Sequence, residues 1–416
     1  MWHAVVRSQT YGSTDVTNPA ATLRRVHPLV AVALALGLAG CVENIPTHPA
    51  LDAAALDVAA IEQAATGAVT IAAGENHSCA IRPDATVVCW GRNKEGQLGD
   101  GTYVLRTTPV QVVGLTNAVS VAAGRFHTCA ILADGTGRCW GKNSSGQLGD
   151  GSGLPSNKPV TVSGLSGALT ISLGAYHSCA LLSNGGGSCW GFNTYGQVGN
   201  GTFTNAVVPV AVSGLTNAVD VEAGWFHSCA VRSDGTAQCW GRGGSGELGS
   251  GGTTNRTTPV AVAGLTGAVD IDGGALHTCV VRTDGTARCW GNNTSGELGN
   301  GTTTNSLVPV VVRGLTAAKA ISAGSSHTCV LRSTGDERCW GSGYFGQLGN
   351  GSTASRSSPV AVSGVTTGTW ISGGNQHSCT LLSDGTARCW GYNSSAQLGD
   401  GTFTTSATPV QVVNYP

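Results

Sequence analysis

Hydrophobic and polar residues alternate along most of the chain in short segments that are separated by glycine-containing turns. Between residues 218 and 265 there are four such segments, at 218–221, 228–232, 237–240 and 259–262. Short alternating or apolar segments of this kind are typical of β-strands, and the intervening Ser-Asp-Gly turn at 233–235 is typical of a hairpin. The pattern predicts four strands, the last of which begins with a proline and therefore suits the edge of a sheet.

The same pattern recurs every 50 residues. His-Ser/Thr-Cys occurs seven times at this interval, with histidines at His77, His127, His177, His227, His277, His327 and His377. Cys-Trp-Gly, a Gln/Glu-Leu/Val-Gly-x-Gly segment and a closing Pro-Val pair recur at the same step. Seven units of four strands predict an all-β fold, a seven-bladed β-propeller with four short antiparallel strands per blade. A solenoid is the alternative, although its terminal repeats normally differ from the middle ones.

Each unit also holds two cysteines ten residues apart, and Cys41 stands outside the repeats. A turn centred on Asp384 places Cys379 directly opposite Cys389, at a Cα separation of ~4.5–5.5 Å that suits a disulfide. We expect one cross-strand disulfide in every unit, each worth on the order of 2–3 kcal/mol. The expected pairs are Cys79–Cys89, Cys129–Cys139, Cys179–Cys189, Cys229–Cys239, Cys279–Cys289, Cys329–Cys339 and Cys379–Cys389.

Two motifs in the repeats could also be interpreted as metal sites, but these interpretations have less support than disulfides and turns. The His-x-Cys motif with the second cysteine offers three ligands for zinc, but no fourth ligand recurs at a fixed spacing. We therefore expect the repeated histidines to make structural hydrogen bonds and the repeated tryptophans to pack in the core. Asp100-Gly101-Thr102 lacks the spacing of carboxylates in a calcium loop and is interpreted as turn chemistry.

Composition and the absence of catalytic motifs argue against two classes of function. The chain has 22 Lys and Arg against 23 Asp and Glu, and only 11% of its residues are charged, less than half the usual ~25%. This balance argues against nucleic-acid binding, which uses a basic face. No Gly-x-Ser-x-Gly, P-loop or His-Glu-x-x-His motif is present, and every His and Cys of the repeats follows the period. We expect a protein that is not an enzyme and that has no cofactor.

The N-terminal region predicts export. An apolar segment at 29–39 follows two arginines and is too short for a membrane span, but it fits the core of a signal peptide. It ends in Leu38-Ala39-Gly40-Cys41, which resembles the lipobox of bacterial lipoproteins and implies cleavage before Cys41 and a lipid on it. We expect a leader at 1–41, an Ala-rich tether at 42–67 and the propeller at 68–416. An ordinary secretory signal or a short membrane anchor is the alternative.

The repeat itself resembles the RCC1 (regulator of chromosome condensation) repeat. The shared pattern is Gly-x-x-His-Ser/Thr-Cys, then Asp-Gly-Thr, then Cys-Trp-Gly-x-Asn-x-x-Gly-Gln-Leu-Gly-x-Gly-Thr. The resemblance covers all seven units and implies a seven-bladed propeller, although RCC1 repeats usually lack these cysteines. Blades of this family often combine strands from both chain ends, which implies that 410–413 complete the blade that begins near Val69.

The differences between the units mark candidate binding residues. The two residues before each repeated His vary and should surface on one face of the disc. Matching loops engage partner proteins in RCC1-like propellers such as a secreted β-lactamase inhibitor and a plant ultraviolet-B receptor. We predict a partner-binding face at Arg125, Phe126, Tyr176, Trp225, Phe226 and Leu276; the alternative is that these aromatics half-pack into the blade tops. Two further variable loops contain Tyr195, Tyr344 and Phe345, and residues 103–107.

Acidic residues form a mild cluster in units four and five. They are Asp220, Glu222, Asp270, Asp272, Glu247 and Glu297. We interpret Asp220 and Asp270 as outward-pointing residues of alternating strands.

Three functions are consistent with these observations. We favour a monomeric, non-enzymatic scaffold in the bacterial cell envelope, as an outer-membrane lipoprotein or at the cell surface. It would be attached to the membrane only through the lipid on Cys41 and would present one face to a protein or glycan, with no nucleic acid as partner. An inhibitor of an extracellular enzyme such as a β-lactamase is one alternative. Nucleotide exchange on a small GTPase is another, but the resemblance associates that activity with an inserted wedge, and all units here have equal length.

Overall fold

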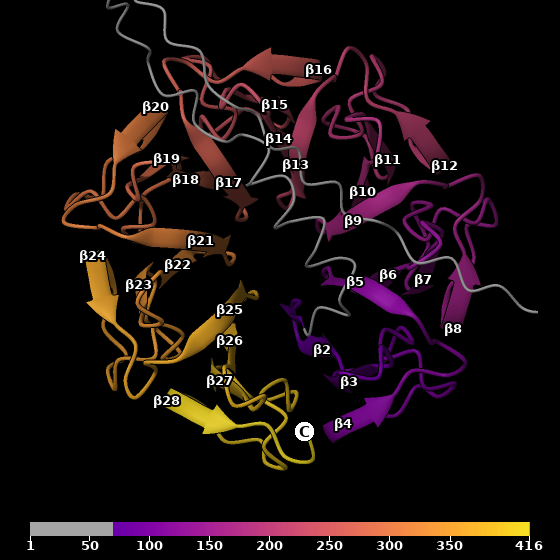
Figure 1. Ribbon diagram of the computed structural model, residues 1–416. Helices are drawn as coiled ribbons and strands as arrows, with labels where there is room; N and C mark the ends of the chain where they lie inside the picture. The colour runs from indigo at the N-terminus through magenta and orange to yellow at the C-terminus, as the bar shows by residue number, and fades with distance from the viewer. Residues whose placement is uncertain (1–69, 416) are drawn as a thin grey trace, which may run out of the picture. The chain divides into compact units, whose positions relative to one another are not determined.

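The computed structural model describes residues 70–415, and every regular element within them is a β-strand. The strands form seven four-stranded antiparallel sheets, which are arranged as blades around a common axis (Figure 1). The seven-bladed propeller predicted from the 50-residue period is confirmed, and the solenoid alternative is wrong. None of the elements between residues 70 and 415 is a helix long and apolar enough to cross a membrane.

Each blade uses one strand from each of four positions, counted outward from the axis. The innermost strands are β1 (Ile71–Ala73), β5 (Ala118–Ala123), β9 (Ala168–Leu173), β13 (Ala218–Ala223), β17 (Ala268–Gly273), β21 (Ala318–Ala323) and β25 (Gly368–Gly373). The second strands are β2 (His77–Ile81), β6 (His127–Leu132), β10 (His177–Leu182), β14 (His227–Arg232), β18 (His277–Arg282), β22 (His327–Arg332) and β26 (His377–Leu382).

The two outer positions complete each blade. The third strands are β3 (Val87–Gly91), β7 (Gly137–Gly141), β11 (Gly187–Gly191), β15 (Ala237–Gly241), β19 (Ala287–Gly291), β23 (Glu337–Gly341) and β27 (Ala387–Gly391). The outermost strands are β4 (Arg106–Gln111), β8 (Ser156–Thr161), β12 (Ala206–Ala211), β16 (Arg256–Ala261), β20 (Ser306–Val311), β24 (Arg356–Ala361) and β28 (Ser406–Gln411).

The hairpin between the second and third strands sets the position of the cysteines. In the last blade the turn closes with a hydrogen bond from the Gly385 nitrogen to the Leu382 oxygen, and Gly385 has a φ of 84°. That left-handed conformation favours glycine. The turn brings Cys379 opposite Cys389, and the two form a disulfide. All seven predicted disulfides are present, with Cα separations of 4.0–4.1 Å.

The outermost strand can contain a proline because its pairing with the third strand is irregular at that point. In the fourth blade β16 pairs only with β15 and starts at Arg256, earlier than the sequence predicts. The register shifts between the Cys239–Val260 pair and the Gly241–Arg256 pair. Pro259 lies in this shift on an edge strand, where its lack of an N–H group costs no ladder hydrogen bond.

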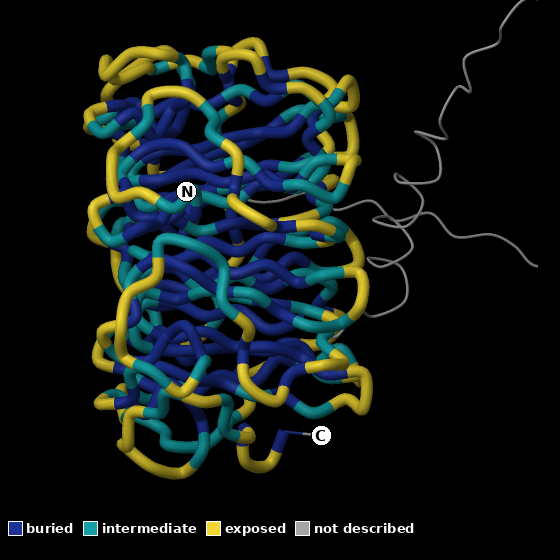
Figure 2. Tube along the Cα trace, turned by 90° about the vertical axis from the view of Figure 1, so that its left-hand side faces the viewer, coloured by how far each residue is buried: buried dark blue, intermediate teal, exposed yellow. Residues whose placement is uncertain are grey.

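The core lies inside and between the blades. Buried residues fill the interior of the disc, whereas exposed residues lie on the loops at its two faces and around its rim (Figure 2). The seven repeated tryptophans have no exposed surface. Each donates its indole N–H to a carbonyl of the neighbouring blade, as Trp140 does to Gln97 at 2.9 Å. The prediction that these tryptophans pack in the core is confirmed.

The ring closes without exchange of strands, so one expectation is wrong. The last strand, β28, pairs with β27 in its own blade, and β1 pairs only with β2. Residues 410–413 therefore do not complete the first blade. The physical reason is that each repeat begins with an innermost strand and ends with an outermost one, so that every blade comes from one repeat. The contacts between the last and first blades match those elsewhere: Trp90 donates to the Gln397 carbonyl at 2.9 Å.

Candidate partner-binding face

Two loops of every blade meet on one face of the disc. The first joins the innermost strand to the second, and the other follows the third strand. They are held together by the same backbone bond in each blade, for example from the Arg92 nitrogen to the Asn76 oxygen at 2.9 Å and from Phe192 to Tyr176 at 2.9 Å. The residues before each repeated His therefore lie on a common face, as expected. Most of them are half-buried, and Ala175 and Ala275 are buried.

Aromatic side chains of the second, third and fourth blades form one contiguous cluster on this face. The Tyr176 ring lies 6.1 Å from Phe126 and 6.5 Å from Phe226, measured between centroids. Phe192 lies 6.1 Å from Tyr176 in an edge-to-face arrangement, and Tyr195 lies 5.5 Å from Phe226. Edge-to-face and tilted arrangements are the ones that aromatic pairs prefer.

Cations cover this cluster from the first and second blades. The Arg125 guanidinium lies 5.0 Å from the Phe126 ring and 5.5 Å from the Trp225 ring, and it donates to the Tyr176 hydroxyl at 3.2 Å. The Lys142 ammonium also lies over Phe126, at 5.2 Å. We call this set the aromatic–cationic patch; it consists of Arg92, Arg125, Phe126, Lys142, Tyr176, Phe192, Tyr195, Trp225 and Phe226.

The patch lies near the axis of the ring. Arg125 belongs to the second blade and Trp225 to the fourth, so their contact spans the loop of the third blade. Arg125 also forms an ion pair with Glu75 of the first blade, with 2.6 Å between Nε and Oε2. One guanidinium thus contacts loops of three other blades, which is possible only where the loops of the innermost strands converge.

Five of the six residues predicted for the face lie together in the patch. The sixth, Leu276, is half-buried in the fifth blade, outside the patch as defined here. Of the other variable residues, Tyr195 joins the patch. Tyr344 and Phe345 instead form a separate pair 6.0 Å apart, next to Tyr392.

Three patch residues were missed in the sequence. Arg92, Lys142 and Phe192 each follow a Cys-Trp-Gly motif directly, and this position also varies from unit to unit. The signal was therefore present, but it lies 16 or 17 residues after the variable pair in the chain. The hairpin that carries the disulfide brings the two positions together.

The repeated histidines make a ring of buried hydrogen bonds. His77 Nε2 lies 2.9 Å from the Thr128 hydroxyl, which in turn donates to the Gln97 carbonyl at 2.8 Å. A hydroxyl has one proton, so Nε2 must be the donor. Burial lowers the pKa of His77 to about 3, with a smaller contribution from Arg92. His377 contacts Ser78 in the same way at 2.9 Å and closes the ring, so the predicted structural role is confirmed.

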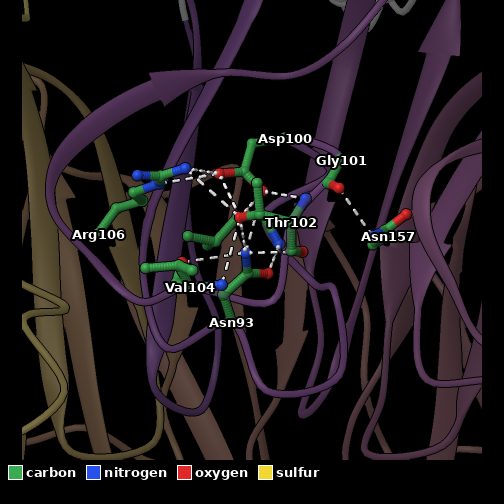
Figure 3. Close-up of polar contacts among 8 residues, drawn as sticks. Asn93, Asp100, Gly101, Thr102, Val104, Arg106 and Asn157 are labelled. Carbon is green, nitrogen blue, oxygen red and sulfur yellow. Dashed lines mark hydrogen bonds and ion pairs between the residues drawn. The ribbon is translucent and has the colours of Figure 1, made fainter.

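Neither metal-binding alternative is supported by the side chains. Both cysteines of each repeat are joined in a disulfide, which leaves no thiolate for the His-x-Cys motif. Asp100 accepts hydrogen bonds from Asn93 at 3.0 Å and from the Thr102 nitrogen at 3.0 Å, and it pairs with Arg106 at 2.7 Å (Figure 3). Burial opposes ionisation, but the bonds from Thr102 and Arg106 outweigh it and lower the pKa of Asp100. The segment is a loop stabilised by its own side chains, as interpreted.

The acidic residues of the fourth and fifth blades do not point outward into solvent, so that interpretation is wrong. Asp220 and Asp270 lie on the innermost strands β13 and β17 and accept backbone hydrogen bonds from the next blade, at 3.3 Å from Ile271 and 2.7 Å from Ile321. Burial, together with the neighbouring Asp272, raises the pKa of Asp220 to about 7. These carboxyls connect neighbouring blades near the axis of the ring.

Glu247 and Glu297 lie elsewhere, at the positions that Gln97 occupies in the first blade. Both are buried, and burial raises the pKa of each. Glu247 accepts from Arg242 at 2.6 Å, and Glu297 accepts from Asn292 at 3.1 Å. The six acidic residues therefore form two separate sets.

Comparison with known proteins settles the family. A model of the RCC1-like domain matches residues 47–316, and models of the RCC1 repeat match 318–347, 339–381 and 371–397. The chain belongs to the RCC1-like domain family. The first match covers more than half of the chain, and the resemblance of the repeats to RCC1 is confirmed.

Solved structures agree with this fold. Human WBSCR16 is 24% identical over 79% of this chain and 94% of that chain, with a TM-score of 0.71. Yeast RCC1 (Prp20), in a complex with Kap60, is 19% identical over 92% of this chain and 91% of that chain, with a TM-score of 0.73. The receptor kinase CR4 ectodomain of Physcomitrella patens is 20% identical over 77% and 72%, with a TM-score of 0.51. No curated protein sequence matches the chain.

Proposed function

We propose that this RCC1-like propeller is a non-enzymatic scaffold that binds a protein partner through the aromatic–cationic patch. The observation that carries this proposal is the gathering of aromatic rings and cations from four blades on one loop face. Partly exposed Trp, Tyr and Arg side chains on a rigid framework are the residues that most often dominate protein interfaces. The framework is rigid because a disulfide lies beneath each pair of loops.

Relatives with the same fold support a binding function. Yeast Prp20 was solved in a complex with Kap60, and its structure was described together with its binding to Gsp1p and histones. Nucleotide exchange is not favoured for this chain, because the described blades have the same loop lengths and residues 70–415 contain no inserted wedge. The alternative of an enzyme inhibitor is a special case of the scaffold and is covered by the same test.

The test is photo-crosslinking at the patch. A photoreactive phenylalanine analogue is placed at Phe226, or at Tyr344 on the aromatic pair outside the patch, in cells that make the protein. We expect a defined adduct from position 226 only. Unlabelled protein should compete for it, whereas the Trp225→Ala variant should not. Equal adducts from both positions, or equal competition by both proteins, would contradict the proposed site.

We further propose that the protein acts in the bacterial cell envelope. The seven disulfides support an oxidising compartment, because such bonds are rare in the cytosol. The lipobox-like segment, Cys41 and the tether lie outside the described residues, and the lipid anchor rests on the sequence alone.

The mass of the intact protein tests the proposed location in the cell envelope. The mature protein is alkylated without reductant and weighed. We expect a lipid on Cys41 and no alkylated thiol. Alkylation of all fourteen repeat cysteines and of Cys41 on an uncleaved chain would contradict the envelope proposal and would leave the patch proposal standing.

A further inference from the structure

The aromatic–cationic patch has more hydrogen-bond donors than acceptors. Within residues 70–415, Arg92, Lys94, Lys142 and Glu95 form no ion pair. On the face loops of blades one to four, Arg125 pairs with Glu75 and Arg242 pairs with Glu247. Five cations on these loops therefore stand against three carboxylates, and the excess lies in the first two blades, which favours an anionic ligand.

Buried amide groups beneath the patch add to this excess. In each repeat the residue at the position of Gln97 uses one side-chain oxygen to accept the backbone N–H two residues earlier, at 2.9 Å for both Gln97 and Gln147. The other side-chain atom of each is then Nε2, a donor. Gln97 and Gln147 have no exposed surface, and their Nε2 atoms have no hydrogen-bond partner.

Equivalent contacts in other blades show where these nitrogens point. The corresponding atom of Glu247 lies 2.6 Å from Arg242, and that of Gln347 lies 3.3 Å from Ser342. The partner is in each case the residue that follows Cys-Trp-Gly. In the first two blades that residue is Arg92 or Lys142, which are donors themselves. By this equivalence, we infer that the Nε2 donor of Gln97 or Gln147 is directed toward a cation, an arrangement that lacks an acceptor.

We propose that the patch binds an acidic peptide segment of the partner, whose carboxylates lie between Arg92, Lys142 and the amide nitrogens of Gln97 and Gln147. This inference rests on the proposed function and names the chemistry of its ligand. A peptide is favoured because carboxylate oxygens match the donors, while the half-buried rings of Phe126 and Tyr176 pack against adjacent side chains. The fourth blade provides the same acceptor internally, since Glu247 neutralises Arg242.

The test uses fluorescein-labelled hexaglutamate and hexaglutamine with the purified full-length chain at low salt. We expect hexaglutamate alone to raise the anisotropy. The key variant is Gln97→Glu/Gln147→Glu, which copies the self-neutralised arrangement of the fourth blade and should weaken binding at least tenfold. The Arg92→Glu/Lys142→Glu variant should do the same.

Matched controls separate this effect from charge or misfolding. Gln397→Glu makes the same substitution in the seventh blade, outside the patch, and Lys158→Glu reverses an exposed charge on β8. Both should bind hexaglutamate as the wild type does, and all variants should retain seven disulfides by mass. Equal loss in the controls, or no binding of hexaglutamate by the wild type, would overturn the proposal.

A third probe distinguishes the source of the carboxylates. Hexagalacturonate carries the same number of carboxylates on sugars, and equal or tighter binding of this probe would overturn the assignment to a peptide. An adduct at position 226 without hexaglutamate binding would refute the acidic ligand and keep the proposed site. Loss of both would refute the site itself.

Discussion

The loops of blades one to four and those of blades five to seven share a backbone but differ in chemistry. The bond that joins the two loops of a blade is 2.9 Å long at both Arg92 and Tyr392. In the first region the side chains are cations and aromatics that contact one another across blades. In the second they include Asn292, Ser325 and Ser342, and a smaller aromatic group without a cation. The comparison shows that this fold separates stability, which every repeat supplies, from recognition, which a few variable positions supply.

The largest expected effect is acid unfolding of both regions together. Burial lowers the pKa of His127, for example, to about 3 from an ordinary value of 6.5. The unfolded chain takes up protons below pH 6.5 that the folded chain cannot, so stability is present above that pH and falls as the pH drops toward 3. Each buried imidazole should make the folded state less stable by several kcal/mol at pH 3 than at neutral pH, from ~1.4 kcal/mol per unit of pKa shift. A circular-dichroism titration should show one transition; two transitions would mean that the regions fold independently.

The next effect should be equal in the two regions. His177→Ala in blade three and His327→Ala in blade six each remove a buried ring that contacts a serine at 2.9 Å. Each should lower the free energy of unfolding by about 3 kcal/mol through the cavity and the unpaired hydroxyl. Guanidinium unfolding measures this. A difference above about 1 kcal/mol between the two would show that the blades are not energetically equivalent.

A smaller effect on stability is expected at one position of the second region, where a buried acidic residue replaces the alanine of other repeats. Glu337 is buried between blades six and seven, and burial raises its pKa to about 8 from 4.5. The folded chain keeps a proton there that the unfolded chain releases, so stability falls as the pH rises from about 4.5 to about 8. Glu337→Ala, which matches Ala237 and Ala287, should therefore stabilise the protein at pH 8 by on the order of 1–3 kcal/mol.

That gain should almost disappear at pH 4.5, where the wild-type carboxyl is protonated in the folded chain and about half protonated in the unfolded chain. Thermal unfolding at the two pH values measures the difference. Equal stabilisation at both would assign the effect to packing rather than to ionisation.

The smallest effect on stability should accompany an effect on binding. Glu75→Gln removes the ion pair with Arg125, whose side chain is 30% exposed. Such pairs contribute under ~1 kcal/mol, so the melting temperature should hardly change. Freed of its internal carboxylate, the patch should bind hexaglutamate more tightly. Weaker binding of the probe would show that Glu75 positions Arg125 rather than competing with the ligand.

The features that were predicted correctly from the sequence are those that repeat with the 50-residue period. The blade number, the disulfides and the roles of the repeated histidine and tryptophan each follow from a spacing that recurs without a gap. The place of Trp225 and Phe226 on one face was also predicted, because this position varies within an otherwise regular repeat. Position in the repeat was sufficient for all of these.

The predictions that failed, and the residues that were missed, all depend on contacts between loops or between blades. Asp220 was assigned outward because alternation along one strand does not show the neighbouring blade, whose Ile271 nitrogen it accepts. Arg92 and Lys142 were missed because only a folded hairpin brings them to the variable loops. Closure of the ring was predicted incorrectly from the family, since the boundaries of a repeat in sequence do not reveal which strand is outermost.

The closure of the ring has a consequence for assembly. His377 contacts Ser78 as every other repeated histidine contacts the hydroxyl of the following blade, so the junction between the chain ends has the same central contact as the other six. This contact does not distinguish one junction from another. A chain cut between any two blades and joined at its old ends would build the same disc. During synthesis, the shared contact would let a nascent blade pack against the wrong neighbour, including one from another molecule. The geometry of seven blades per turn, together with the contacts that differ between junctions, such as that of Asp220 with Ile271, then selects the correct ring.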